Sequence, residues 1–264
     1  MPGAVHAFAD LGPLALAGLA LCGLVGGVGI TALGPGGVLV TIGLYALSGL
    51  RPEAVAGTAI ATHVGTGALG TATYLRSGHL AGPSTRRTAG ILVTAALIGT
   101  PVGVWINSCV SHDGFGALLG GCVVVAGVLV LWRDRRESRP PAATMRGDVP
   151  VIAAVGAAVA AAGGLFGIGG PLLAVPLLVV LDMPILAALG AAQAQSIVIA
   201  GVGTITYVAQ GAISWPLLLV VGVPELAGVV IGARVARAAP THRLRLALVA
   251  ALLACGVVLV VQSA

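Results

Sequence analysis

Apolar residues gather into ten segments along the chain, five in each half, separated by short polar or glycine-rich stretches. A helix that crosses a membrane needs about 20 apolar residues, so the last three segments of each half are long enough and the second is short. We therefore predict an all-α, polytopic membrane protein. The segments are 13–30, 36–50, 53–75, 88–107 and 115–132 in the first half, and 149–165, 169–181, 184–209, 214–235 and 244–262 in the second.

The two halves align with each other at an offset of 133 residues. The stretch GPGGVLVTIGL at Gly34 lies over GIGGPLLAVPL at Gly167, and GTATYLRSG lies over GTITYVAQG, with 14 identities over the 47 positions from 34 to 80. Glycine and alanine raise such a score by chance, but the shared Thr, Thr and Tyr do not follow from composition. The chain is an internal duplication, which predicts a first transmembrane repeat over 1–132, a cytoplasmic linker over 133–148 and a second transmembrane repeat over 149–264.

Composition supports the membrane assignment. Hydrophobic residues make up 58% of the chain and charged residues 8%, whereas soluble domains carry about 25% charged residues. All thirteen basic residues are arginines, and they cluster in loops without interleaved aromatic residues, which excludes a nucleic-acid footprint. The four cysteines form no C-x-x-C pair and have no histidine at ligand spacing, so we interpret them as packing residues and predict neither a metal nor a cofactor.

Loop charges orient the two halves. Arg76, Arg86 and Arg87 mark one loop of the first half as cytoplasmic, and the arginine-rich linker lies on the same side. The corresponding loop of the second half is uncharged. The arginines of the second half lie in the next loop instead, around Arg243. The repeats are therefore predicted to be inverted, with both termini outside the cytoplasm. Five crossings per half, or three crossings and a re-entrant hairpin, satisfy these charges equally.

Glycine clusters interrupt the helices at equivalent places, LGPGG and FGIGG, each with a proline nearby. Non-helical backbone at membrane depth is tolerated only where protein or a water-filled cavity covers it, and paired breaks in inverted repeats are typical of transporter sites. Two short-helix N-termini pointing inward would form an anion site without a side-chain cation. The candidate substrate-binding glycines are Gly34, Gly36, Gly37, Gly167, Gly169 and Gly170. Close helix packing is the alternative, and we favour it for Gly99, Gly103, Gly228 and Gly232.

Polar residues inside the third segments are the next candidates, because each is costly in lipid and is usually turned inward. Hydroxyl and amide donors suit an oxyanion, and interhelical hydrogen bonding is the alternative. The residues are Thr58, Thr62 and His63 in the first half and Gln193, Gln195 and Ser196 in the second.

His63 and Glu225 are the ionisable residues that lie well inside long apolar segments. An intramembrane carboxylate is by default a functional hypothesis, so we interpret this pair as proton-coupling residues. A glutamate satisfied by a serine or a backbone partner is the alternative. No second ligand stands at helical spacing from His63, which argues against a metal site there.

The pattern GGLFGIGGPLLAVP, followed by GAAQAQS, VGTITYVAQGAIS and GVVIGARVAR, resembles the second repeat of the sulfite exporter TauE/SafE family of membrane permeases. The resemblance implies an inverted duplication and outward transport of small oxyanions such as sulfite and organosulfonates. The chain departs from the family in having Pro171 where a third glycine is frequent, and Ala191, Ala192 and Gln193 in place of a GTS motif.

The predicted function is therefore a secondary transporter of a small oxyanion in a bacterial inner membrane, and not an enzyme, since no catalytic motif is present. An anion channel or a non-transporting membrane scaffold is the alternative. The expected partners are a small anionic substrate and the lipid bilayer, with no nucleic acid; a homo-oligomer stays open.

Overall fold

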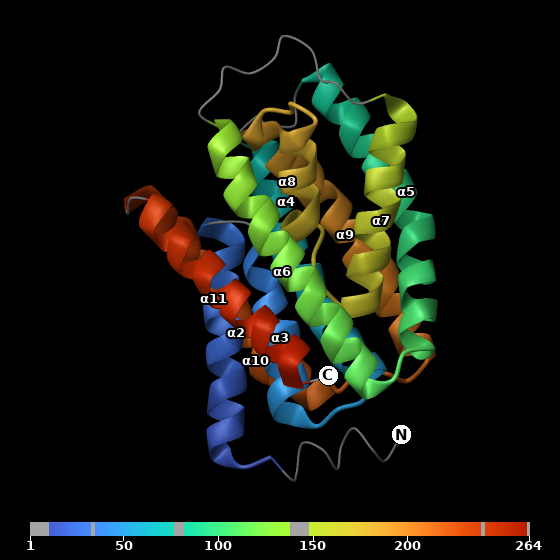
Figure 1. Cartoon of the computed structure of the whole chain (residues 1–264), viewed down its shortest axis with the longest axis vertical. Coiled ribbons are helices and arrows are strands. Elements are labelled where there is room, and N and C mark those ends of the chain that lie inside the picture. Colours follow the sequence, from blue (N-terminus) through green and yellow to red (C-terminus); the bar gives the residue numbers. More distant parts are fainter. Residues whose placement is uncertain (1–10, 33–34, 77–81, 138–147, 239–240, 263–264) are drawn as a thin grey trace.

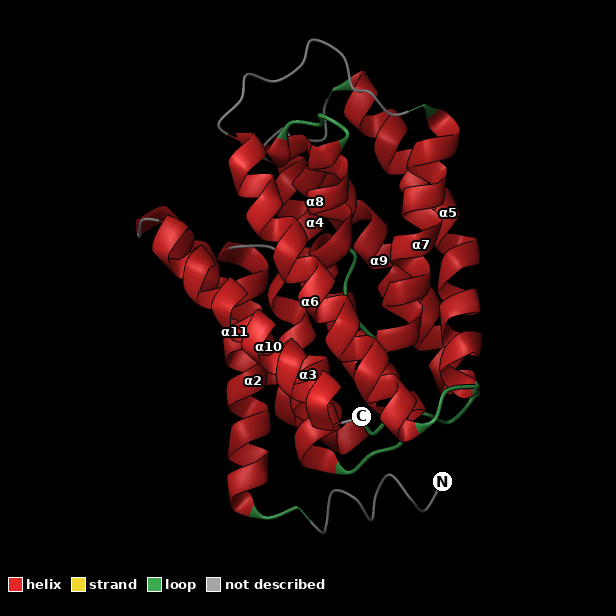
Figure 2. Cartoon of the chain, viewed as in Figure 1, coloured by secondary structure: helices red, strands yellow, loops and turns green. Residues whose placement is uncertain are grey.

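A computed structural model describes residues 11–32, 35–76, 82–137, 148–238 and 241–262. All regular elements in these ranges are helices and none is a strand (Figure 2), as the apolar pattern predicts. The first half contains α2 (Pro13–Ala32), the short 3-10 helix η1 (Pro35–Gly37), α3 (Val38–Ser48), α4 (Pro52–Arg76), α5 (Pro83–Ser108) and α6 (His112–Glu137), and the second contains α7 (Val149–Phe166), α8 (Pro171–Val180), α9 (Ile185–Ala209), α10 (Trp215–Ala238) and α11 (Thr241–Gln262).

The short helices α3 and α8 are the returning arms of two hairpins. Gly18 of α2 faces Leu47 of α3, and Cys22 faces Gly43, so the two helices run antiparallel. In Figure 1, α2 and α3 form a hairpin toward the lower end and α7 and α8 one toward the upper end. With 11 and 10 residues, α3 and α8 are about 15 Å long, half of what a span needs. The short length of α3 and α8 favours the re-entrant one of the two arrangements that the loop charges allow.

Helix pairing follows the duplication. The helix α2 packs against α10, its equivalent α7 packs against α5, and α4 packs against α9 at the centre. Gly70 faces Gln193 across this central pair, and Gly203 faces Ile60. These two contacts are equivalent at the offset of 133 residues, which relates Ile60 to Gln193 and Gly70 to Gly203. The antiparallel central pair is consistent with inverted repeats.

The glycines assigned to helix packing lie where two backbones approach closely. A Cβ added at Gly103 would clash with the Ala161 carbonyl of α7, and one at Gly228 would lie 2.1 Å from the Leu24 carbonyl of α2. Gly99 and Gly232 face the same two helices at equivalent places. Helices in a membrane are expected to pack closely through small residues, as these parallel pairs do. The reason is that the surrounding lipid is itself apolar, so the hydrophobic effect does not bring the helices together.

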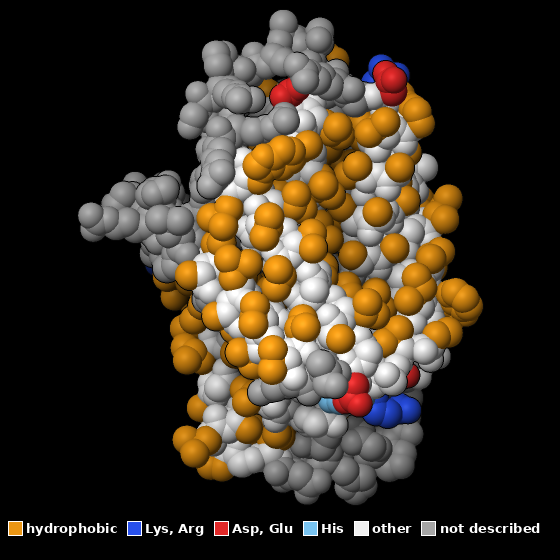
Figure 3. Space-filling model, viewed as in Figure 1, with side chains coloured by type: hydrophobic (Ala, Val, Ile, Leu, Met, Phe, Trp, Pro, Cys, Tyr) orange, Lys and Arg blue, Asp and Glu red, His pale blue; other side chains and the backbone are white. Residues whose placement is uncertain are grey.

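Six described helices are long and apolar enough to cross a membrane, namely α2, α5, α6, α7, α9 and α10. Among the segments predicted to qualify, 53–75 falls short in apolar content, because α4 is long enough but its threonines and His63 lower its hydropathy. These polar side chains are buried against neighbouring helices. For 244–262, the described residues of α11 include one shorter apolar stretch, Leu252–Val261. The outer face shows apolar side chains across its middle and charged ones at its two ends (Figure 3). The protein is a multi-pass membrane protein.

The ends of the described segments agree with the predicted orientation. The helix α6 ends and α7 begins at the upper end of the molecule, while α2 begins and α11 ends at the lower end (Figure 1). Arg86 and Arg87 lie near the start of α5, at the upper end as well. The described helix ends that flank the arginine-rich linker thus lie at the same end of the bundle as the start of α5, which is consistent with the predicted orientation.

Candidate functional site

The break between α7 and α8 is made by a left-handed glycine. Gly167 ends α7 with φ +70°, the conformation in which glycine commonly terminates helices. The Ile168 amide donates to the Gly163 carbonyl at 3.2 Å. A Cβ at Gly167 would lie 2.3 Å from the Ala56 carbonyl of α4. This residue therefore turns the chain and lets α4 approach, and its own amide caps α7 rather than facing a ligand.

The N-termini of α3 and α8 meet at a small cavity near the middle of the bundle. Gly37 and Val38 line it from the start of α3, and Gly169, Pro171 and Leu172 line it from the start of α8. The remaining lining residues are Ile30 of α2, His63 and Thr66 of α4, and Gln193 and Ser196 of α9. Its volume of about 20 Å³ holds about one water molecule. Both breaks thus open onto one shared cavity, which four polar side chains border.

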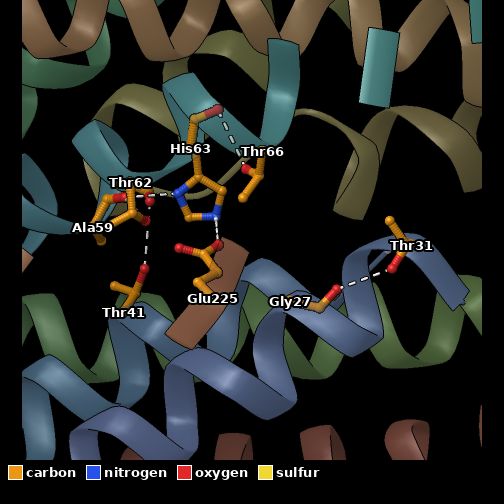
Figure 4. Close-up of polar contacts among 9 residues, drawn as sticks. Gly27, Thr31, Thr41, Ala59, Thr62, His63, Thr66 and Glu225 are labelled. Carbon is orange, nitrogen blue, oxygen red and sulfur yellow. Dashed lines mark hydrogen bonds and ion pairs between the residues drawn. The ribbon is translucent and has the colours of Figure 1, made fainter. Parts of the chain in front are cut away.

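His63 connects this cavity to Glu225. Its Nδ1 donates to the Ala59 carbonyl at 2.7 Å, one turn earlier on α4, while its Nε2 lies 3.7 Å from Oε1 of Glu225 on α10 (Figure 4). The two side chains are 3% and 0% exposed. If both are charged, they attract each other by about 4 kcal/mol at an effective dielectric constant of about 20. A carbonyl only accepts, so Nδ1 carries the hydrogen of this bond, and Nε2 is the ring nitrogen that faces Glu225.

Hydrogen bonding leaves the facing atoms of this pair unsatisfied. His63 Nε2 and both carboxylate oxygens of Glu225 are buried without a hydrogen bond of ordinary geometry. The Thr62 hydroxyl interacts with the Glu225 carboxyl, but its own short hydrogen bond, at 2.8 Å, goes to Ala59. Orphaned buried polar atoms are costly and rare, so these three mark a place where a proton or ligand belongs.

Two glycines keep the imidazole accessible from the cavity. A Cβ at Gly37 would lie 2.3 Å from His63 Nε2, and a Cβ at Gly169 would lie 3.1 Å from the Ser196 hydroxyl and 3.4 Å from His63 Cδ2. The backbone at the start of α3 can approach Nε2 only because no side chain is present at Gly37. An anion between the two helix starts would therefore meet backbone amides, an imidazole and a hydroxyl.

Side chains of three other helices hydrogen-bond to the end of α7 at the second break. Three donors reach the last carbonyls of α7: Asn107 to Leu165 at 2.6 Å, Tyr207 to Gly164 at 2.8 Å, and Thr41 to Gly167 at 3.5 Å. The position equivalent to Thr41 is Ala174, which has no hydroxyl to offer. At the end of α2, before the first break, the Thr31 hydroxyl lies 3.2 Å from the Gly27 carbonyl of its own helix (Figure 4) and 3.1 Å from the Val229 carbonyl of α10.

The structure brings some of the predicted site residues together and places the others elsewhere. Gly37, His63, Gly169, Gln193 and Ser196 line the cavity, and Glu225 lies directly behind His63. Gly170 lies one residue from this lining, with the Ala192 carbonyl 3.2 Å from where its Cβ would be. Gly34 lies outside the described residues.

Five predicted site residues do not line the cavity and instead contact the helices around it. Gly36 packs against the α2 backbone, and Gly167 ends α7. The Thr58 hydroxyl accepts from the Ser214 amide at 3.0 Å, and Gln195 donates to the Gly156 carbonyl at 2.8 Å. Thr62 faces Glu225 rather than the cavity. Hydrogen bonding between helices, the alternative weighed for the polar residues, accounts for Thr58 and Gln195.

Thr66 is a polar lining residue that the sequence analysis missed. It lies one turn after His63, and its hydroxyl donates to the His63 carbonyl at 3.3 Å. Thr66 lies four residues after Thr62 and three residues after His63. This spacing could have identified it, because residues three and four apart share a helix face. The apolar lining from Ile30, Val38 and Leu172 has no comparable signal.

A cavity between the starts of two short helices at equivalent places of repeated halves, within a bundle of apolar helices, is typical of multi-pass membrane transport proteins. The chain belongs to the sulfite exporter TauE/SafE family, whose model matches residues 19–259, nearly the whole chain. This match confirms the resemblance drawn from the glycine motifs. The family consists of sulfite-exporting membrane permeases and not of enzymes. No curated protein and no solved structure matches the chain.

Proposed function

We propose that this protein is a secondary transporter that exports a small oxyanion, such as sulfite or an organosulfonate, across the inner membrane of a bacterium. The anion binds between the N-termini of α3 and α8, near Gly37, Gly169 and Ser196, and His63 faces it. His63 and Glu225 couple its movement to protons. The lipid bilayer surrounds the apolar helices. Membership of the family supports the substrate class.

One observation carries this proposal: the buried Nε2 of His63 has no hydrogen-bond partner and lines a cavity between two helix starts. Helix N-termini favour anions because their free amides and the helix dipole both attract negative charge. The imidazole and the Ser196 hydroxyl add donors to the same space. Each feature alone has structural explanations, but together they form a donor set for a small oxyanion.

The size of the cavity implies movement. About 20 Å³ accommodates about one water molecule and not an oxyanion with four or more heavy atoms. The described conformation is therefore closed, and α3 and α8 must separate for substrate to enter. Alternating access in transporters with inverted repeats occurs by movement of one bundle or repeat against the other around a fixed site.

The test is flux of labelled sulfite and of methanesulfonate in proteoliposomes. We expect saturable flux that unlabelled anion competes away, because a transporter has a finite number of sites. An open channel would not saturate in this way, and a scaffold would produce no flux, so either result would refute the proposal.

A matched pair of histidine variants locates the site. His63→Gln removes the imidazole that lines the cavity and should lower flux about tenfold or more, the equivalent of about 1.4 kcal/mol or more. His112→Gln changes an exposed histidine at the start of α6 and should leave flux near that of the unmodified protein. Equal flux in both variants would show that His63 is not part of the binding site.

A further inference from the structure

The proton count of the His63–Glu225 pair bears on the charge of the substrate. Because Nδ1 donates to Ala59, a neutral His63 presents only a lone pair at Nε2. A carboxylate at Glu225 would then face that lone pair 3.7 Å away, buried and without compensation, which is strongly unfavourable. The empty site therefore holds one proton between Nε2 and Oε1, and the pair as a whole is neutral.

Other described groups do not alter this count. His63 is the titratable side chain among those that line the cavity, and it is the charged partner of Glu225. Titratable side chains on the helices packed around the pair are engaged elsewhere or exposed: Cys22 lies at Gly43, Tyr45 stacks on His112, Tyr207 donates to Gly164 near Glu53, and Arg86 and Arg87 are exposed.

Substrate binding changes the pair's partners. Gly37 and Gly169 leave the imidazole open to the cavity, so a bound anion competes with Glu225 for the Nε2 hydrogen. When His63 donates to the anion as an imidazolium, an ionised Glu225 would be left as a second negative charge next to the substrate at membrane depth. Two close like charges away from water are disfavoured, and uptake of a proton by Glu225 relieves this.

We propose, resting on the transport function proposed above, that the site is selective for monoanions and that each monoanion is carried with one proton. The loaded site then contains an imidazolium, a protonated Glu225 and an anion of charge −1, so it is neutral like the empty site. A dianion would leave one uncompensated negative charge in the same space. The substrate class is therefore sulfonates and hydrogen sulfite, and transport is electroneutral.

The test uses proteoliposomes with an internal pH-sensitive dye and a membrane potential set by a potassium gradient and valinomycin. Methanesulfonate is a permanent monoanion, and sulfate is a dianion with a similar arrangement of oxygens. We expect protons to move with methanesulfonate in the same direction, a rate independent of the imposed potential, and sulfate flux lower by about tenfold or more, because its second charge is buried unpaired.

Glu225→Gln fixes this position in a neutral form. Methanesulfonate flux should persist in this variant with one proton per anion, because His63 without its counter-charge is neutral in the empty site and takes up the proton itself when the anion binds. In His63→Gln, Glu225 stays protonated in both states, so the residual flux should carry no proton and should depend on the potential. Glu53→Gln, at the start of the same helix as His63 and outside the cavity lining, should behave like the unmodified protein.

Potential-driven methanesulfonate flux without proton movement in the unmodified protein would overturn the monoanion inference and leave the transporter intact. Sulfate flux equal to that of methanesulfonate would also overturn it. No saturable flux of any of these anions, or of sulfite, would instead refute the proposed function. The measurements on the unmodified protein decide the question even if Glu225→Gln fails to fold.

Discussion

His63 on α4 and Ser196 on α9 occupy equivalent positions of the two halves, 133 residues apart, and both line the central cavity. Behind His63 lies Glu225 of α10, whereas the position equivalent to Glu225 is Leu92, buried in the apolar core. The duplication therefore repeats the backbone of the site but not its charge. Of the two positions that the duplication relates, one thus carries the buried carboxyl group that faces His63 and the other carries an apolar side chain.

The two hairpins also differ in the side chains that hydrogen-bond to their breaks. The last carbonyls of α7 accept from Asn107, Tyr207 and Thr41, while the equivalent of Thr41 in the second half is an alanine. The titratable pair thus lies beside the start of α3, and side chains of three other helices hydrogen-bond to the end of α7 before α8.

The largest expected effect distinguishes the equivalent glycines Gly37 and Gly170. Both have right-handed helical backbone, with φ −60° and −55°, so alanine fits either backbone. Gly37→Ala places its methyl group 2.3 Å from His63 Nε2, whereas Gly170→Ala meets its first neighbour at 3.2 Å. We expect sulfite flux in proteoliposomes to fall about tenfold or more in the first variant and much less in the second.

The control for this pair is Gly201→Ala, because a Cβ at Gly201 has no neighbour within 4 Å. Valine at Gly37 or Gly169 should abolish flux while the protein still inserts, since both residues border the cavity. Valine at Gly36 is a poor test, because its Cβ would already lie 2.2 Å from the Gly26 carbonyl. If Gly37→Ala transports as well as Gly170→Ala, the asymmetry between the halves has no role in transport.

The next effect is on stability. Gly228→Ala places a methyl group 2.1 Å from the Leu24 carbonyl, where α10 packs on α2. Overpacking costs about 1–3 kcal/mol and occasionally more, so the Tm in detergent should fall clearly. Gly121→Ala on α6, with open space around the added Cβ, is the matched control. A Tm for Gly228→Ala equal to that of the control would contradict the close pairing of α2 with α10.

A smaller loss of stability is expected when a hydrogen bond to the end of α7 is removed. Tyr207→Phe removes the hydroxyl that donates to Gly164 and leaves a buried carbonyl without that partner, at a cost of about 1–3 kcal/mol. Tyr45→Phe removes a longer, exposed bond of 3.3 Å to His112 and should lower the Tm less. Equal shifts in thermal unfolding would mean that Tyr207 does not fix the break.

Much of this architecture could be predicted from the sequence, because helix length, the duplication and arginine placement follow from local composition. The two breaks follow from the glycine clusters, but the approach of Gly37 to His63 beside one cavity depends on how the hairpins fold back, which local patterns do not specify. Gln195 illustrates the limit: it stands between Gln193 and Ser196 in the sequence, but the helical rotation turns it toward α7, where it donates to Gly156.

Glu225 could be singled out because a carboxylate inside an apolar segment is unusual. Its partner could not be deduced from spacing, since α4 and α10 are far apart in the chain. Thr58 was misleading for a related reason: a hydroxyl inside a membrane helix serves equally well as a ligand or as an acceptor for a neighbouring backbone amide, as it does here for Ser214.

The central claim is that His63 Nε2 faces the transported anion while Nδ1 stays bonded to Ala59. The most direct measurement is the ¹⁵N NMR spectrum of ¹⁵N-histidine-labelled protein in lipid, with and without methanesulfonate, assigned by comparison with His63→Gln. We predict that the anion shifts the Nε2 signal of His63 toward the protonated form and leaves Nδ1 protonated. An Nε2 signal unchanged at saturating methanesulfonate, in protein that transports this anion, would contradict the account.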